Sequence, residues 1–136
     1  MTPESGVLLS RFTTIGTGGP ARAFARPETL EALEQALEWA AERELSVATI
    51  GLGSNLLVAD EGFEGLVLKL GGELAEAMVD GERLVAGGGV ANAVCLHRVR
   101  AAGLGGFEFA CAIPGTVGGG VWMNAGAYGS DWAAIL

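Results

Sequence analysis

Apolar and acidic residues alternate with a helical period in one stretch near the beginning of the chain. Thr29 is a residue type that caps helix N-termini, and the periodic stretch extends from there to Glu44. The acidic residues between them fall on the face opposite the apolar positions, as in a helix with one solvated side. We therefore predict an amphipathic helix whose buried face consists of Leu30, Leu33, Leu37 and Ala40 or Ala41.

Short apolar runs on either side of this stretch predict β-strands. Alanines at positions 21, 23 and 25 alternate with other residues after a Gly-Pro turn, which is typical of a short strand. Residues 46–51 are rich in β-branched side chains, so we expect a buried strand there, and residues 65–70 predict another. The first ten residues show no period and are expected to form an irregular arm.

The second half of the chain predicts a hairpin followed by a helix. Residues 73–79 and 82–86 flank Asp80–Gly81, a dipeptide that favours a type I′ turn with positive φ at both positions. Residues 90–102 carry apolar side chains at helical spacing, and Gly103 fits the position that follows a helix. Strands and helices in this order indicate an α+β fold without repeats or an internal linker.

The composition is that of a folded protein with few cations. Half of the 136 residues are hydrophobic, which is ample for a core. Eight basic residues against 16 acidic ones give a net charge of −8, and Lys69 is the only lysine. A protein that binds nucleic acid needs a basic surface to neutralise phosphates, so we expect no nucleic-acid partner. Any anion that binds here must be attracted largely by backbone N–H groups.

The sequence also favours a cytoplasmic protein without a membrane partner. No apolar run reaches the ~18 residues of a membrane span, and the first residues lack the pattern of a secretion signal. Cys95 and Cys111 form no CxxC pair, and both are expected to be reduced thiols in the core. His97 has no neighbouring cluster of cysteine or acidic residues, so we expect no metal site.

Two glycine-rich segments remain as candidates for chemistry, because the chain contains no P-loop, GxGxxG or GxSxG motif. Residues 51–55, Gly-Leu-Gly-Ser-Asn, follow a strand and can point consecutive N–H groups at one anion. Residues 113–119 place a Pro-Gly turn before a short helix that Thr116 can cap, where exposed N–H groups favour phosphate. An ordinary turn and tight packing are the alternative explanations. Together, the two segments suggest a cradle for a pyrophosphate.

The second segment belongs to a longer run, residues 105–129, that mixes glycine with apolar residues and so differs from a flexible linker. An apolar tail, residues 132–136, follows without a terminating signal. This tail leads us to expect that the chain is a piece of a longer protein.

Four motifs occur in the order and spacing of one enzyme family. They are Thr13–Thr14 with Gly18–Ala21, then residues 51–58, 113–119 and 123–129. Together they resemble the N-terminal part of the UDP-N-acetylenolpyruvoylglucosamine reductases, over nearly the whole chain. The resemblance implies an FAD-binding domain over residues 1–136, in the PCMH or vanillyl-alcohol-oxidase-type fold with two small α+β subdomains. The substrate domain that follows in the family is absent here.

The resemblance also implies which residues contact FAD. It implies no catalytic residue and no metal ligand, because the serine, glutamate and arginine that the family uses lie further along than Leu136. The implied cofactor contacts are Gly51, Leu52, Gly53, Ser54, Asn55, Leu56, Gly89, Ile113, Pro114, Gly115, Thr116, Gly118, Gly119, Gly126, Ala127 and Tyr128.

In the family, NADPH reduces the flavin, and UDP-N-acetylglucosamine enolpyruvate is then reduced to UDP-N-acetylmuramate for peptidoglycan synthesis. We expect these small-molecule partners for the parent protein and no turnover by the 136 residues alone. One alternative is an FAD-dependent oxidase or dehydrogenase of the same fold, in which a histidine or cysteine often tethers the flavin. His97 and Cys95 lie on a predicted helix, which disfavours a tether. A non-catalytic flavin-binding fragment is the other alternative.

Overall fold

A computed structural model describes residues 2–136, and the chain divides into two compact units. The first unit ends at Glu73, and the second extends from Leu74 to Leu136. A short 3-10 turn, Gly72–Ala75, contains the division. Each unit has its own helices, strands and hydrophobic core, so the two are described in turn.

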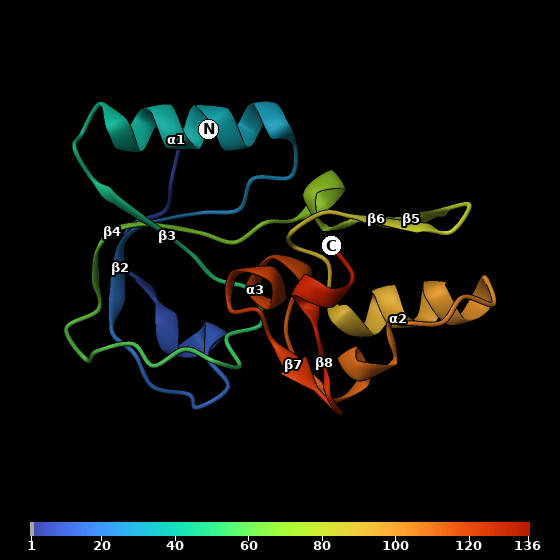
Figure 1. Cartoon of the computed structure of the whole chain (residues 1–136). Coiled ribbons are helices and arrows are strands. Elements are labelled where there is room, and N and C mark those ends of the chain that lie inside the picture. The colour runs from blue at the N-terminus through green and yellow to red at the C-terminus, as the bar shows by residue number, and fades with distance from the viewer. Residues whose placement is uncertain (1) are drawn as a thin grey trace. The chain divides into compact units, whose positions relative to one another are not determined.

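The first unit is built on a four-stranded sheet in the order β1-β2-β4-β3 (Figure 1). Its strands are β1 (Val7–Leu8), β2 (Pro20–Ala25), β3 (Ser46–Thr49) and β4 (Phe63–Leu68). Strands β2 and β3 both run parallel to β4, and β1 runs antiparallel to β2. The predicted strands around residues 21–25 and 65–70 are confirmed.

The prediction of an irregular N-terminal arm is wrong. Besides β1, this segment enters a 3-10 helix, Leu9–Phe12. Further towards the N-terminus, the backbone of Glu4 exchanges two hydrogen bonds with Phe24, of 2.8 and 2.7 Å. Two-residue pairings of this kind are too short to leave a period in the sequence, so the pattern could not predict them.

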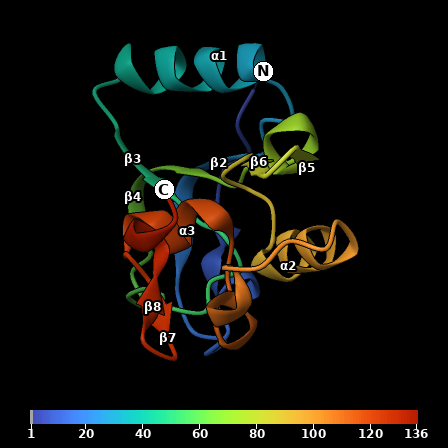
Figure 2. The same ribbon diagram turned by 45° about the vertical axis from the view of Figure 1, so that its right-hand side comes forward.

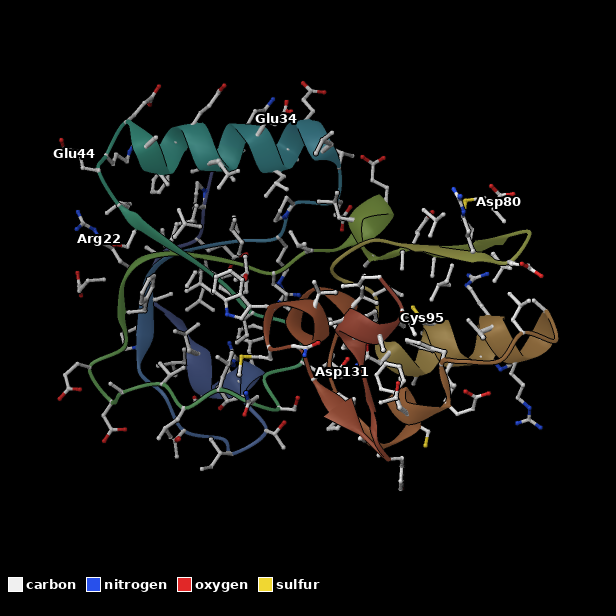
Figure 3. All side chains as sticks on the ribbon, in the orientation of Figure 1. Arg22, Glu34, Glu44, Asp80, Cys95 and Asp131 are labelled. Atoms are coloured by element: carbon white, nitrogen blue, oxygen red, sulfur yellow. The ribbon has the colours of Figure 1, made fainter. Side chains whose placement is uncertain are left out.

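Helix α1 (Leu30–Ala41) confirms the predicted amphipathic helix, although it ends three residues before Glu44. The Thr29 side chain accepts a hydrogen bond from the Ala32 N–H at 3.1 Å, as expected of an N-cap. Figures 1 and 2 show α1 lying across one face of the sheet of its unit. Glu34 is on the side of the helix away from the strands (Figure 3).

The buried face of α1 differs from the prediction. Leu30 and Leu37 are 57% and 42% exposed, whereas Ala36 and Ala40 are completely buried. The two helix alanines pack in one cluster with small residues of β2, together with larger side chains of β4 and of the helix itself. Small side chains on both surfaces let the helix approach the sheet closely, which leaves its larger leucines at the margins. The cluster consists of Ala23, Ala25, Ala36, Ala40, Leu66 and Leu68, with Leu33, Trp39 and Leu45 at its edge.

The opposite face of the sheet buries a second cluster. Successive residues of a strand point to opposite faces, so Phe24 and Val67 lie on the side away from α1. Leu9 and Ile50 complete this side. The strand predicted at residues 46–51 exists as β3, but it is largely exposed because it forms the edge of the sheet; only Ile50, which follows it, is buried.

The second unit opens with the predicted hairpin, β5 (Ala77–Asp80) and β6 (Arg83–Ala86). Its turn is shifted by one residue from the prediction, because Asp80 pairs with Arg83 and the loop is Gly81–Glu82. Only Gly81 has positive φ, at 59°, which matches a type II′ turn and not type I′.

The predicted second helix is α2 (Asn92–Ala101), which contacts β5 and β6. Gly103 follows it with φ of 70°, as expected for the residue after a helix. The glycine-rich run then forms short elements joined by turns. They are the 3-10 helices Glu108–Ala112 and Trp132–Ala134, helix α3 (Val117–Trp122), and the strand pair β7 (Gly126–Ala127) and β8 (Ser130–Asp131).

Aromatic rings fill the core of the second unit. Phe107, Phe109 and Trp132 meet edge to face, with centroid distances of 5.4 to 6.3 Å. Trp132 is therefore a core residue and not part of an unpaired apolar tail, although Leu136 is exposed. The edge-to-face geometry is the arrangement that aromatic quadrupoles favour.

The two cysteines lie in different surroundings. Cys95 is fully buried on the side of α2 that faces the β5–β6 hairpin (Figure 3), as predicted. Cys111 is exposed, which corrects the prediction that both thiols belong to the core. Both are free thiols. Burial raises the pKa of the Cys95 thiol, and the nearby Arg98 offsets only part of that rise.

We expect one thiol of the native protein to react with Ellman's reagent and two after unfolding in urea. Cys111 is accessible, whereas Cys95 is shielded and stays protonated, and the thiolate is the reactive form. Cys111→Ser should therefore abolish the native reaction and leave one thiol in urea. Rapid reaction of two thiols in the folded protein would contradict the burial of Cys95.

Candidate functional site

The carboxyl ends of three parallel strands lie at one edge of the first unit's sheet. Arg26 follows β2, Lys69 follows β4, and Ile50 and Gly51 follow β3. The ladder continues past the strands, since the Lys69 N–H donates to Ala25 and the Ile50 N–H donates to Leu68. Loops at the carboxyl edge of parallel strands are the usual place for ligands in such sheets.

The predicted anion-binding residues 51–55, which we name the GLGSN loop, begin at this edge. Gly53 is buried and has φ of 71°. A β-carbon at this position would lie 1.8 Å from the carbonyl oxygen of Phe12, so only glycine fits here without a shift of the backbone. The Gly53 carbonyl accepts a hydrogen bond of 3.0 Å from the Thr14 N–H. The loop is thus packed onto the segment that follows the first 3-10 helix.

The GLGSN loop retains backbone donors. Within residues 2–136, the N–H groups of Leu52, Gly53 and Asn55 donate to no backbone carbonyl. An open hollow of about 380 Å³ lies beside Gly53 and Asn55. Its lining residues are Thr14, Ile15, Gly53, Ser54, Asn55, Leu56 and Leu57. Donors beside an open hollow fit the anion-binding role that the sequence predicted for this loop.

Two cations near the loop were not predicted from the sequence. The Lys69 ammonium donates a hydrogen bond to the Gly51 carbonyl. Both Lys69 and Arg26 lie over the ring of Phe12, at 5.9 and 5.2 Å from its centroid. Burial, and secondarily the charge of Arg26, lower the pKa of Lys69. Arg26 could have been identified from its position immediately after the strand predicted at residues 21–25, whereas Lys69 lies inside the strand predicted at residues 65–70 and gave no such signal.

The second predicted segment, residues 113–119, is in the second unit. Thr116 caps α3 as predicted, since its hydroxyl accepts a hydrogen bond from the Gly119 N–H at 3.4 Å. Two other N–H groups of this turn are already used, because Val117 donates to Val90 and Gly118 donates to Gly88, both at 2.9 Å. The expectation of open donors is therefore wrong at Val117 and Gly118, where the tight-packing alternative holds.

Asn92, at the start of α2, is hydrogen-bonded to residues 113–115 of this segment. Its backbone N–H donates to the Gly115 carbonyl at 3.0 Å, and its side-chain Nδ2 donates to the Ile113 carbonyl at 3.1 Å. The residue is 1% exposed, and its Oδ1 has no hydrogen-bond partner within residues 2–136. Asn92 was not predicted from the sequence, because polar residues are common at helix starts and its contacts with Ile113 and Gly115 are tertiary.

The remaining predicted contacts also lie in the second unit. Gly89 precedes α2, and its N–H is bonded to the Leu74 carbonyl at 2.9 Å. Gly126 and Ala127 form β7, and Tyr128 with Gly129 makes the turn to β8. Both turn residues have positive φ, of 54° and 78°, the pattern of a type I′ turn. The Tyr128 ring is 82% exposed.

Residues 2–136 contain no group of three or more histidine, cysteine or acidic side chains that could hold a metal ion. They also include no helix that is long and apolar enough to cross a membrane. His97 is exposed on α2 and has no part in either glycine-rich segment.

Comparison with known protein families gives one match that covers most of the chain. The family described as FAD binding domain matches residues 21–135. This range includes both glycine-rich segments and residues 126–128. Of the resemblance motifs, it leaves out Thr13, Thr14 and Gly18–Pro20.

Characterised relatives share a single name. UDP-N-acetylenolpyruvoylglucosamine reductase 2 of Symbiobacterium thermophilum is 48% identical over 128 residues, which are 94% of this chain and 42% of the relative. The reductases of Rubrobacter xylanophilus and Bacillus subtilis are 44% and 42% identical, over 94% of this chain and 43% and 42% of their own lengths. The chain thus spans less than half the length of these relatives.

A solved structure gives the same result for the fold. The crystal structure of UDP-N-acetylenolpyruvylglucosamine reductase from Thermus caldophilus matches with a TM-score of 0.80 and 39% identity, over 96% of this chain and 45% of that one. These similarities confirm the predicted resemblance, the α+β FAD-binding fold and FAD as the cofactor of the family.

We expect Gly53→Ala to destabilise the protein far more than Gly81→Ala. Both glycines have positive φ, so each alanine variant loses about 1–2 kcal/mol to backbone strain. Only at Gly53 does the new β-carbon also collide with a backbone carbonyl, which should raise the loss to about 3 kcal/mol or more. Urea unfolding of the two variants measures the difference, and equal losses would show that the loop has no tight contact with Phe12.

We expect Asn92→Ala to loosen the Ile113–Gly115 turn. The variant leaves a carbonyl without its donor, which should cost about 1–3 kcal/mol in the free energy of unfolding. Val99→Ala is the matched control, since Val99 is buried on the same helix and its loss should cost about 2 kcal/mol. Only Asn92→Ala should shift the amide NMR signals of Ile113, Gly115 and Thr116. Similar shifts in both variants would refute the hydrogen bond between Asn92 and Ile113.

Proposed function

We propose that this chain, which belongs to the FAD binding domain family, binds FAD through its two glycine-rich segments. The GLGSN loop is the part we assign to the diphosphate. The N–H groups of Leu52, Gly53 and Asn55, which donate to no backbone carbonyl within residues 2–136, and the adjacent hollow in the first unit carry this assignment. A diphosphate needs several donors at once, and a chain with a net charge of −8 has few side-chain cations to supply them.

The residues present fit such a cofactor. The GLGSN loop offers backbone donors and the Asn55 amide, and Lys69 adds a positive charge beside its first residue. Ile113–Gly119 offers a surface of fixed shape, since its turn is tied to α2 and to Gly88. We assign to FAD the full predicted set of residues in both segments, together with Gly89.

The exposed Tyr128 ring suits a contact with the flavin. Its φ of 54° is uncommon for a residue with a side chain, and the turn that imposes it holds the ring out from β7 and β8. An aromatic side chain in this position offers an apolar face to a flat ring system. We propose Gly126 and Ala127 as its neighbours in the flavin contact.

For the whole protein we propose the activity that its relatives' name states, reduction of UDP-N-acetylglucosamine enolpyruvate. FAD, when bound, would supply the hydride, and NADPH would be the source of its electrons. We further propose that the protein acts in the cytoplasm in peptidoglycan precursor synthesis. Residues 1–136 form the FAD-binding part in this proposal, and none of them is assigned a role in proton transfer.

The oxidase or dehydrogenase alternative has less support. All the relatives cited above are named as reductases of one substrate. A flavin tether through Cys95 is disfavoured by its complete burial and by the raised pKa of its thiol.

Titration with FAD tests the proposed binding. We expect a saturable change in flavin fluorescence at micromolar protein, and binding of riboflavin at least about tenfold weaker, because riboflavin lacks both the diphosphate and the adenosine of FAD. Asn55→Asp should weaken FAD binding about tenfold or more, since it places a negative charge in the GLGSN loop. Its melting temperature should stay near that of the wild type because Asn55 is exposed.

Gln35→Glu is the matched control, because it makes the same amide-to-carboxylate change on the exposed face of α1. It should leave FAD affinity within about threefold. Equal weakening by the two substitutions would refute a diphosphate site at the GLGSN loop. An absence of saturable binding to the wild-type chain would refute FAD binding by these residues.

A further inference from the structure

We propose that Lys69, the only lysine of the chain, is a positioning residue that holds the GLGSN loop in the conformation that presents its N–H groups to phosphate. The proposal rests on the proposed FAD binding for its ligand. Lys69 lies outside both glycine-rich segments.

One anchor of the loop acts through the planarity of the peptide bond. Lys69 donates to the carbonyl of Gly51, the residue that joins β3 to the loop. In a trans peptide the carbonyl of one residue and the N–H of the next point in opposite directions. A Gly51 carbonyl directed at Lys69 therefore directs the Leu52 N–H away from it. That N–H donates to no backbone carbonyl within residues 2–136.

A second anchor acts in the same way two residues later. The Thr14 N–H holds the Gly53 carbonyl at 3.0 Å, which sets the direction of the N–H of Ser54. Gly53 itself is pressed against the Phe12 backbone. Alternate carbonyls of the loop are thus both held by the rest of the unit. Fixed carbonyls orient the N–H groups of the loop, and oriented backbone N–H groups can bind an anion.

The charge on Lys69 has no carboxylate partner within residues 2–136. Its ammonium and the Arg26 guanidinium share the ring of Phe12, which in turn stacks on Phe24 at 4.9 Å. Within residues 2–136 the one ion pair is Arg43 with Glu42, so neither cation has a carboxylate partner. Burial and the charge of Arg26 lower the pKa of Lys69, which reflects the cost of this arrangement. An uncompensated cation pair in an acidic chain fits a site for a polyanion.

A purely structural role for Lys69 makes a different prediction. As a tie between the ends of β3 and β4, it would stabilise the fold without altering the loop or its ligand. A purely electrostatic role is also distinct, since Arg26 lies on the same ring and should then contribute as much as Lys69. Two variants, Lys69→Met and Arg26→Met, separate the three roles.

We expect Lys69→Met to weaken FAD binding about tenfold, and Arg26→Met to weaken it less than threefold, because only Lys69 bonds the loop. Amide order parameters of residues 52–55 from NMR give the independent readout in the free protein. They should be near 0.85 in the wild type and in Arg26→Met, and fall below about 0.6 in Lys69→Met. Thermal unfolding of both variants accounts for any general loss of stability.

Each other outcome overturns the proposal. Equal effects of the two variants on affinity would mean that charge alone matters. A lower melting temperature for Lys69→Met with unchanged loop order parameters would mean a structural tie only. Failure of the wild type to bind FAD would refute the proposed function, whereas the order parameters of the free protein would still decide whether Lys69 holds the loop.

Discussion

The parallel pairing of β2 and β3 with β4 is the constraint on which the candidate site of the first unit depends. Parallel strands bring their carboxyl ends to one edge, and helix α1 supplies the long connection that parallel pairing requires between β2 and β3. The GLGSN loop begins at that edge, and Arg26 and Lys69 follow their strands there. Close packing of α1 through Ala36 and Ala40 keeps the sheet in place beneath them. The fold therefore determines the position of the loop before any ligand contact is considered.

The two glycine-rich segments use glycine for different reasons. In the GLGSN loop, Gly53 lets the backbone lie against Phe12 with positive φ, and the N–H groups of Leu52 and Asn55 donate to no backbone carbonyl within residues 2–136. In the second segment, Gly118 lies against the Gly88 carbonyl and donates to it. One segment thus keeps its donors for a ligand, and the other uses them to hold its own shape. Glycine content alone does not distinguish these two uses.

Sequence analysis predicted what local patterns encode and failed where a tertiary contact decides. Thr29 and the helical period identified α1, because capping and amphipathicity are properties of a single segment. The period could not tell that Ala36 would be buried in place of Leu37, since that choice depends on the small residues of β2. Cys111 and the amides of Val117 and Gly118 were misjudged for the same reason. Lys69 was noted only as a scarce cation, because its partner Gly51 lies 18 residues away in the sequence.

A chain of this charge has to bind a diphosphate with little help from long-range attraction. Surface carboxylates repel an approaching polyanion, and salt screens that repulsion only beyond roughly 8–10 Å. Fixed N–H dipoles act at hydrogen-bond distance, where they are effective only if the loop does not have to reorganise on binding. In this acidic chain, FAD affinity therefore depends more on the rigidity of the loop than on positive charge. A glycine pressed onto Phe12 and a lysine bonded to Gly51 both supply that rigidity.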